Sequence, residues 1–421
     1  MPMIVNILIF LIGIAVYAGY GIGGLGYLLS ATLVSYGAAL FTKKHRWIAW
    51  VSIILNAGML TAVKLQPLTG FPILSVMGIS YFTLQIISYN VDVYKGKYPA
   101  EKNLFRYALY VTYLPHLFLG PIERYDAMAP VLRQRNMTWD GVLAGGARVL
   151  WGLFKKLVIA TRIGVIVSAI SADTGAYQGA YALGAMLLYS LQLYSDFSGG
   201  IDMVLGASQM LGIPMSENFD APYLSQSFQE FWRRWHMSLG SWLKEYVYIP
   251  LGGNRKGNVR KVCNLIITFL VSGLWHGIQY LLWGLINGLF VACGTRLQTR
   301  FKTLNRVAVF LLVSFLWSFF IWQDTLTAVK MVASVFTTFN YSAFFAAIGI
   351  MGLTSGDWIV LAVSLGILWV YDLRAGHIRT RFTGLHPAVK VAIIGALALL
   401  ILVFGMYGIG FNAEAFIYSR F

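Results

Sequence analysis

Apolar segments long enough to cross a membrane recur along almost the whole of this 421-residue chain, and they constrain its fold more than any other feature. A helix needs about 20 apolar residues to cross a hydrocarbon core of about 30 Å, where no water reaches unpaired backbone groups. Candidate segments lie at about residues 3–20, 24–42, 47–64, 67–90, 104–120, 141–171, 178–200, 263–293, 304–322, 326–348, 358–371 and 388–411. We therefore predict an all-α polytopic membrane protein with about 10 to 12 transmembrane or re-entrant helices.

The composition excludes a soluble protein of this size. Hydrophobic residues make up 58% of the chain and charged residues 11%, with a mean hydropathy of +0.68, which leaves too little polar surface to face water. The chain has no Gly/Ser/Pro-rich linker, no low-complexity tract and no internal repeat. We therefore expect one integral domain over residues 1–421 with its first span retained, and not a transporter built from inverted repeats.

Basic residues are concentrated in short connections. The 32 Lys and Arg outnumber the 16 Asp and Glu, and they cluster at 43–46, 95–102, 124–135, 255–261 and 296–306. In a membrane protein this pattern marks cytoplasmic loops and contact with anionic lipid. We therefore expect a multi-pass protein in contact with the lipid bilayer, with no nucleic-acid partner.

One histidine lies within an apolar run of about thirty residues. His276, in the sequence SGLWHG, lies roughly 20 Å along a helix that begins near Cys263, which would place it near the middle of the membrane. An ionisable side chain at that depth is costly, so it predicts a functional site. The alternative is a buried histidine that is hydrogen-bonded to a neighbouring helix.

Between Gly200 and Cys263 the chain becomes more polar and aromatic. Bulky apolar residues recur at three- and four-residue spacing, at Phe228, Phe231, Trp232, Trp235, Leu239, Trp242, Leu243 and Tyr246. This spacing predicts one amphipathic helix in the interface plane, with its tryptophans at the headgroup level. His236 lies at the edge of the apolar face, where it could be an ordinary interfacial residue.

The sequence PLGGNRKG, residues 250–257, predicts a tight turn. Its Asn254, Arg255 and Lys256 could hold phosphates with the backbone N–H groups of the turn, although the spacing is not that of a P-loop. The alternative is an ordinary basic cytoplasmic loop.

Several other polar or small residues have structural explanations. Asp196, Asp202 and Glu217 are expected to pair with Arg or Lys of neighbouring helices. Ser272 would share a helical face with His276, but no nucleophile elbow or acidic partner supports a serine hydrolase. Small residues at Gly273, Gly277, Gly284 and Gly288 are typical of helix packing. Cys263 and Cys293 have no metal-binding or redox spacing and no H-E-x-x-H motif occurs, so no metal site is predicted.

Two longer motifs carry a resemblance to a known family. The sequence FWRRWHMSLGSWLKEYVYIPLGGNRKG from Phe231 and SGLWHG from Ser272 closely resemble the membrane-bound O-acyltransferase family, in its bacterial branch containing alginate O-acetyltransferase. Shorter motifs resemble the same branch in the same order: GISYFT at 78–83, YNVDVYKG at 89–96, GPIER at 120–124, YSDFS at 194–198 and ENF at 217–219. The likeness covers about residues 15–292, whereas the C-terminal helices at about 304–411 match only as hydrophobic spans.

The resemblance implies a ring of helices around a thin, recessed centre that is open to both faces. The nearly invariant histidine of the family falls on His276, and the second histidine of this branch falls on His236. His276 would be the general base, and His236 would orient the acyl group, share proton transfer or bind the oxyanion. Trp275 and Trp235 would shape a tunnel for the donor.

The resemblance also implies a substrate class and partners. It predicts a bacterial plasma-membrane O-acetyltransferase that binds no cofactor, takes acetyl groups from acetyl-CoA and serves an extracytoplasmic polysaccharide through a separate esterase-like transferase. Within the family, the alternative is a D-alanyl transferase for teichoic acid, which is supplied by an acyl carrier protein. From a different class, the alternative is a transporter or polymer exporter whose histidine binds a proton or the substrate.

Overall fold

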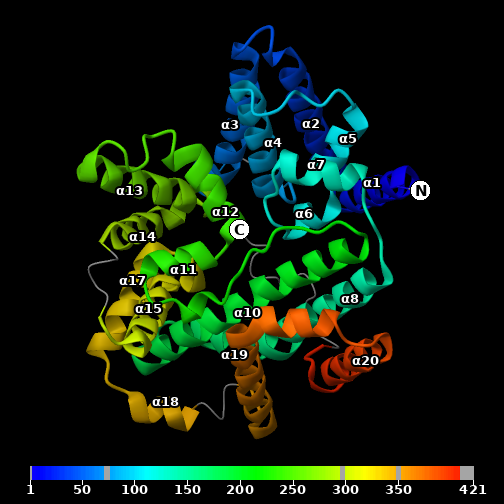
Figure 1. Cartoon of the computed structure of the whole chain (residues 1–421). Helices are drawn as coiled ribbons and strands as arrows, with labels where there is room; N and C mark the ends of the chain where they lie inside the picture. The colour runs from blue at the N-terminus through cyan, green and yellow to red at the C-terminus, as the bar shows by residue number, and fades with distance from the viewer. Residues whose placement is uncertain (1, 71–75, 294–298, 348–351, 408–421) are drawn as a thin grey trace.

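The computed structural model describes residues 2–70, 76–293, 299–347 and 352–407, and these residues are mainly helical (Figure 1). The described residues contain no β-sheet and one isolated bridge, between Phe219 and Trp235. Six helical stretches there are long and apolar enough to cross a membrane: Met3–Tyr20, Ile22–Thr42, Trp47–Thr69, Lys302–Trp322, Ser355–Thr383 and Pro387–Phe404. The protein is therefore an all-α polytopic membrane protein, as predicted.

The α-helices in chain order are α1 (Pro2–Tyr20), α2 (Ile22–Thr42), α3 (Trp47–Thr69), α4 (Ile79–Lys95), α5 (Leu104–Val111), α6 (Leu114–Phe118), α7 (Tyr125–Arg133), α8 (Trp139–Leu153), α9 (Thr161–Ala172), α10 (Ala180–Met210), α11 (Phe228–Arg234), α12 (Met237–Leu243), α13 (Gly257–His276), α14 (Leu281–Cys293), α15 (Lys302–Leu316), α16 (Ser318–Trp322), α17 (Thr325–Thr337), α18 (Tyr341–Ala347), α19 (Ser355–Thr383) and α20 (Pro387–Phe404). Two π-helical stretches, η1 (Phe154–Ala160) and η3 (Lys244–Tyr248), and two 3-10 turns, η2 (Pro222–Leu224) and η4 (Ile278–Tyr280), complete the set.

Several predicted spans are divided. The segment 104–120 forms the short helices α5 and α6, and the segment 326–348 forms α17 and α18. The segment 67–90 contributes α4 only from Ile79 onward. The end of the segment 388–411 lies outside the described residues.

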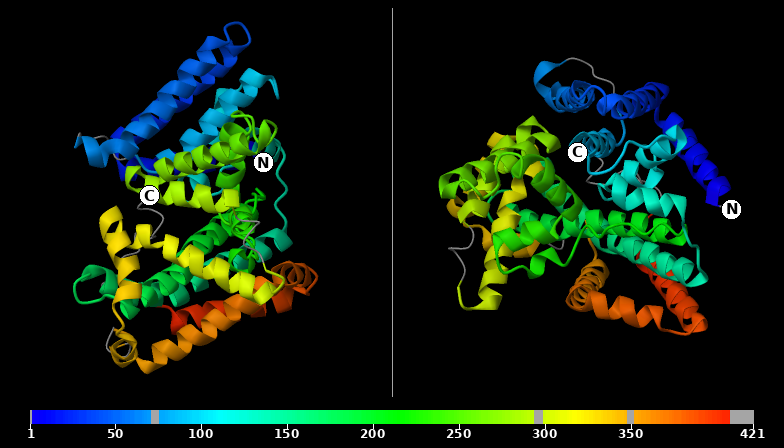
Figure 2. Two further views of the ribbon diagram at one scale, coloured as in Figure 1. Left: turned by 90° about the vertical axis from the view of Figure 1, so that its left-hand side faces the viewer. Right: turned by 45° about the horizontal axis from the view of Figure 1, so that its top comes forward.

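Helices α8 and α10 form a close-packed pair (Figures 1 and 2). A Cβ atom on Gly152 would lie 2.4 Å from the carbonyl oxygen of Gly199, and one on Gly145 would lie 2.5 Å from that of Gly206. Only glycine permits backbones to approach so closely, as in the small-residue contacts of membrane helices. These glycines bring the charged residues of α8, η1 and α10 within reach of one another.

The three acids form ion pairs with basic residues of α8 and η1, as expected, and the carboxylates of Asp196 and Asp202 are buried whereas that of Glu217 is partly exposed. Asp196 pairs with Lys156 at 2.5 Å, and Asp202 pairs with Lys155 at 2.6 Å. Arg148 lies 2.8 Å from Asp202 and 2.6 Å from Glu217. Both lysines belong to the π-helical stretch η1, which interrupts the α8–α9 helix. Pairing offsets the cost of placing these charges in the protein interior.

The apolar run 263–293 forms a helical hairpin and not a single span. Helix α13 ends at His276, because Gly277 adopts a φ of 150° that ends the helix, and η4 then leads into the antiparallel α14. Gly273, Gly284 and Gly288 lie at the close contact within the hairpin, as expected, whereas Gly277 ends α13 instead. A Cβ atom on Gly284 would lie 2.4 Å from the carbonyl oxygen of Phe269. The hairpin places His276 at a helix end.

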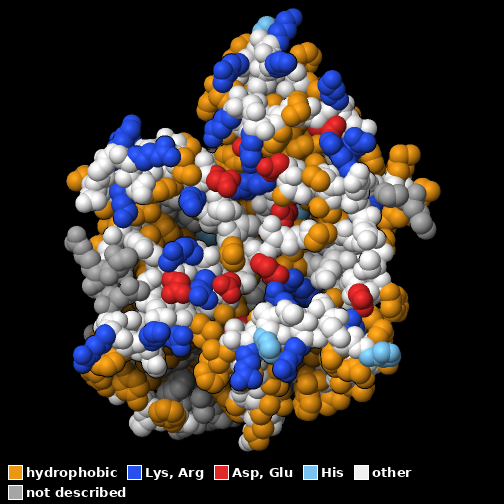
Figure 3. Space-filling view, viewed as in Figure 1, with side chains coloured by type: hydrophobic (Ala, Val, Ile, Leu, Met, Phe, Trp, Pro, Cys, Tyr) orange, Lys and Arg blue, Asp and Glu red, His pale blue; other side chains and the backbone are white. Residues whose placement is uncertain are grey.

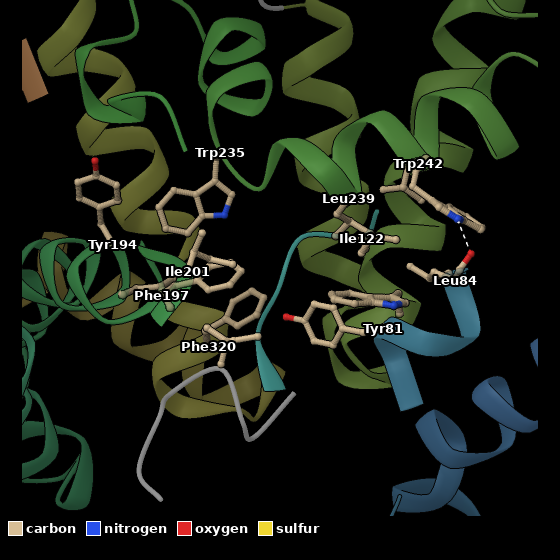
Figure 4. Packing of buried hydrophobic residues seen from close by; sticks show 14 of the residues in the cluster. Tyr81, Leu84, Ile122, Tyr194, Phe197, Ile201, Trp235, Leu239, Trp242 and Phe320 are labelled. Atoms are coloured by element: carbon tan, nitrogen blue, oxygen red, sulfur yellow. Dashed lines mark hydrogen bonds between the residues drawn. The ribbon is translucent and has the colours of Figure 1, made fainter. Parts of the chain in front are cut away.

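The predicted interfacial helix over 228–246 is wrong in its continuity and in its environment. It is broken into α11 and α12, with Trp235 extended and His236 in the left-handed region at a φ of 47°. The physical reason is that residues 218–220 bond to the broken backbone: the Asp220 N–H donates to the Arg234 carbonyl and the Met237 N–H to the Asn218 carbonyl, both at 3.0 Å. The side chains of Trp235, Leu239 and Trp242 are packed in the protein interior and not among headgroups (Figure 4).

Basic residues are unevenly distributed among the connections between helices. The connections α2–α3, α4–α5 and η3–α13 carry Lys or Arg, whereas α1–α2, α9–α10, α13–α14 and α16–α17 carry none. Figure 3 shows Lys and Arg side chains spread over the face that carries α11, α12 and the start of α13, with hydrophobic side chains along its edges. This uneven distribution of Lys and Arg is the kind that the positive-inside rule describes.

Candidate active site

A cavity of about 570 Å³ contains both of the histidines singled out by the sequence. Helix α13 lines it with Lys261, Leu265, Thr268, Ser272 and His276. Their three- and four-residue spacing places them on one helical face. Fifteen residues at the helical rise correspond to about 22 Å, so the cavity extends from near the basic start of α13 to its last residue.

His276 lies at the inner end of this row, among aromatic rings. Its side chain is buried, with the residue 7% exposed. The imidazole centroid is 4.7 Å from the Trp275 ring, 5.6 Å from Trp283 and 5.4 Å from Phe320, all edge-on. The rings exclude bulk water from the imidazole, which strengthens any hydrogen bond made there.

His236 approaches the same cavity from the break between α11 and α12. It is 3% exposed, and its ring lies 5.0 Å from Phe197 and 6.0 Å from Trp275. Its Nδ1 is 3.3 Å from Oδ1 of Asn218. The structure therefore brings two histidines that are 40 positions apart in sequence to one cavity, and both imidazoles pack against the Trp275 ring.

The two predicted tunnel tryptophans differ in position. Trp235 lines the cavity, whereas Trp275 lies behind its wall. The Trp275 indole donates a hydrogen bond to the carbonyl of Ser80 at 3.3 Å, and its ring packs edge-on against Tyr81. Figure 4 shows Tyr81 on the opposite side of the packed cluster from Trp235, with its hydroxyl pointing toward Phe320. Trp275 thus supports both imidazoles from behind.

The predicted turn is present but lies outside the cavity. Gly252 and Gly253 have φ values of 108° and 57°, and Asn264 of α13 donates to the Gly253 carbonyl at 2.8 Å, which fixes the turn to the helix. Asn254, Arg255 and Lys256 are exposed and are not among the lining residues. The turn nevertheless borders the opening, because a Cβ atom on Gly253 would contact the ring of Tyr248, which lines the cavity.

Three cations that line the cavity were missed by the sequence analysis. They are Arg233, Lys244 and Lys261, and none forms a salt bridge with any residue that the structure describes. A continuous helix over residues 228–246 would place Arg233 and Lys244 on its polar face, but the segment is divided into α11 and α12. The spacing of Lys261 was a usable signal, since a residue fifteen positions before His276 lies on the same helical face about four turns away.

A second cavity, of about 340 Å³, lies beside the first and is more polar. Its walls include Lys155, Asp202, Asp372 and Arg379, and Met237 lines both cavities. In the described part of the chain, no cluster of three His, Cys, Asp or Glu has a geometry that could hold a metal ion. The first cavity presents two imidazoles, hydroxyl groups and three cations.

Comparison with known proteins gives the family context. The sequence model of the membrane-bound O-acyltransferase family matches residues 99–335. The chain is 36% identical over 385 residues to a probable alginate O-acetylase of Pseudomonas fluorescens, covering 88% of this chain and 77% of that protein. It is 33% identical over 299 residues to a peptidoglycan O-acetyltransferase of Helicobacter pylori, with 61% and 56% covered. It is 26% identical over 294 residues to a teichoic acid D-alanyltransferase of Streptococcus thermophilus, with 65% and 70% covered.

Proposed function

Because this chain belongs to the membrane-bound O-acyltransferase family, we propose that it transfers acetyl groups from a cytoplasmic thioester for O-acetylation of an extracytoplasmic polysaccharide of the bacterial cell surface. One observation carries the proposal: a single cavity connects three unpaired cations at the basic face to two buried imidazoles. Relatives named for alginate and peptidoglycan O-acetylation support the acetyl group and the polysaccharide class.

The proposed reaction uses His276 as the general base. Its imidazole removes the proton of the acceptor hydroxyl, the hydroxyl oxygen attacks the thioester carbonyl, the carbon–sulfur bond breaks and the proton passes to the leaving thiolate. A neutral imidazole can accept the hydroxyl proton at its free nitrogen and then return it, so it suits both transfers. His236 takes part as a second imidazole at the same carbonyl.

The donor is proposed to be acetyl-CoA, which enters from the basic face. Its phosphates would contact Arg233, Lys244 and Lys261, because unpaired cations beside a cavity favour polyanionic ligands. Its extended arm would follow the lining face of α13 toward His276. Arg255 and Lys256, with Asn254, would make outer contacts with the same phosphates from the bordering turn.

A D-alanyl transferase with an acyl carrier protein is the second candidate within the family, and relatives with that name support it. A carrier protein needs a broad docking surface, whereas coenzyme A needs a narrow opening with cations. The cations that line the cavity favour coenzyme A. A separate extracytoplasmic esterase-like transferase is proposed to receive the acetyl group and pass it to the polymer.

The deciding experiment uses purified protein in proteoliposomes with labelled acetyl-CoA added on the side of the basic face. We expect acetyl label on the extracytoplasmic transferase or on polysaccharide in the lumen, without any carrier protein. Label that appears only with a D-alanyl carrier would overturn the choice of donor. Polymer or proton flux without thioester consumption would instead indicate a transporter.

A further inference from the structure

The side chain of Asn218 lies beside the imidazole of His236. This asparagine is fully buried in the segment between α10 and α11, and its carbonyl accepts the Met237 N–H at 3.0 Å. The neighbouring Asp220 N–H donates to the Arg234 carbonyl at the same distance. Asn218 is thus held by backbone bonds on both sides of the break that carries His236.

The orientation of the Asn218 amide follows from a third contact. The Ser238 backbone N–H lies 2.9 Å from the atom assigned as Oδ1. A backbone N–H can only donate, so the atom facing it must be the amide oxygen and not the amide nitrogen. The Ser238 N–H therefore settles which of the two amide atoms of Asn218 is the oxygen.

The same oxygen decides which nitrogen of His236 carries the proton. Oδ1 of Asn218 lies 3.3 Å from Nδ1 of His236, and an amide oxygen can only accept. Nδ1 must therefore donate, and in a neutral imidazole the lone pair then resides on Nε2. The left-handed backbone of His236, at a φ of 47°, is rare for a non-glycine residue and is held in place by these bonds.

We propose that Asn218 is a positioning residue that holds His236 in its Nδ1–H tautomer, so that Nε2 can share with His276 the transfer of the acceptor hydroxyl proton to the leaving thiolate. Of the three roles open to His236, this one retains proton transfer and excludes hydrogen-bond donation to the oxyanion by the neutral ring. The role in transfer rests on the proposed function, whereas the tautomer rests on the contacts of Asn218 alone.

The first test is spectroscopic and needs no substrate. Protein with ¹⁵N-labelled histidine is examined by NMR in detergent at a pH where the rings are neutral, and the His236→Gln variant identifies the signals. We expect a protonated Nδ1 and an unprotonated Nε2 for His236. A protonated Nε2 in the wild-type protein would overturn the proposal, whatever the enzymatic activity.

Two variants then connect the tautomer to turnover. Asn218→Asp keeps an acceptor for both donors, so the tautomer should persist and turnover should remain within about tenfold of wild type. Asn218→Leu removes the acceptor, so Nε2–H should appear and kcat should fall at least about tenfold, with the donor KM unchanged. An Asn218→Leu protein with normal turnover, or an Asn218→Asp protein that is inactive although folded, would contradict the proposal.

The matched control is Asn56, another buried asparagine, whose amide donates to the Ser52 carbonyl at 2.9 Å within α3. Asn56→Leu should change the melting temperature without changing kcat or the His236 signals. If the wild-type protein has the expected tautomer but consumes no thioester, the acyltransferase proposal fails while the assignment of Asn218 stands.

Discussion

At the scale of single residues, His276 carries the strongest expectation about catalysis. His276→Ala should lower acyl transfer by at least about 100-fold, because a general base contributes about that much or more. His236→Ala should also impair transfer. The measurement is thioester consumption by protein whose melting temperature in detergent matches wild type. Near-normal turnover by a folded His276→Ala variant would remove this residue from the chemistry.

The buried pair of Lys156 and Asp196 carries an expectation about stability. Both side chains are almost fully buried, so Asp196→Asn would remove the carboxylate that pairs with the Lys156 ammonium, at a cost of about 3–5 kcal/mol. Thermal unfolding in detergent measures the loss. The control is Asp126→Asn at the exposed pair with Lys97, for which a change of about 0–1 kcal/mol is expected. Equal losses at the two sites would contradict the argument from burial.

At the scale of helices, the contact of α8 with α10 depends on glycine. Gly152→Val would place side-chain atoms against the Gly199 carbonyl, which belongs to a rigid backbone, and should cost about 3 kcal/mol or more. Gly146 lies in the same helix with no atom near its Cβ position, so Gly146→Ala should be neutral or stabilise by up to about 1 kcal/mol. Melting temperatures of the two variants test the pair, and similar values would show that the close contact is unimportant.

The cations that line the cavity and those of the bordering turn lead to a separate prediction about donor binding. Replacing Arg233, Lys244 and Lys261 by Gln should raise the donor KM more than it lowers kcat, because these residues bind a part of the donor far from the reacting carbonyl. Replacing Arg255 and Lys256 by Gln should raise the KM less, since these two residues lie outside the cavity.

Initial rates over a range of donor concentrations give both constants. The control replaces Lys43 and Lys44, in a basic connection on the α2–α3 hairpin, and should leave the KM unchanged. If all three sets behave alike, the basic residues act only as a topology signal.

The sequence predicted helices well and their interruptions poorly. Hydropathy located the long spans because a bilayer demands about 20 apolar residues wherever a helix crosses. The break at Trp235 and His236 was invisible to periodicity, because it depends on backbone bonds to residues 218–220. The motifs supplied the two histidines, but helical spacing could not place Arg233 or Lys244 once the assumed helix was divided. Backbone hydrogen bonds between residues far apart in sequence determined both the helix break and the positions of these two cations.

At the scale of the whole molecule, the distribution of charge predicts its orientation. The α2–α3 connection should face the cytoplasm and the α9–α10 connection the opposite side, since the first is rich in Lys and Arg and the second has none. In a protein with Cys263 and Cys293 replaced by Ser, Lys44→Cys and Thr174→Cys should react with a membrane-impermeant maleimide from opposite sides. Labelling of both positions from the same side would refute this topology.

The aromatic enclosure of His276 has a further consequence, for the length of the acyl group. With the rings of Trp275, Trp283 and Phe320 closed around the imidazole, each added methylene of a longer thioester would have to displace packed aromatic atoms. Acetyl thioesters should react faster than butyryl thioesters, and Phe320→Ala should narrow that gap in a competition assay. The three rings would then limit the length of the acyl chain that fits against His276. This protein would therefore select acetyl donors from a mixture of cellular thioesters.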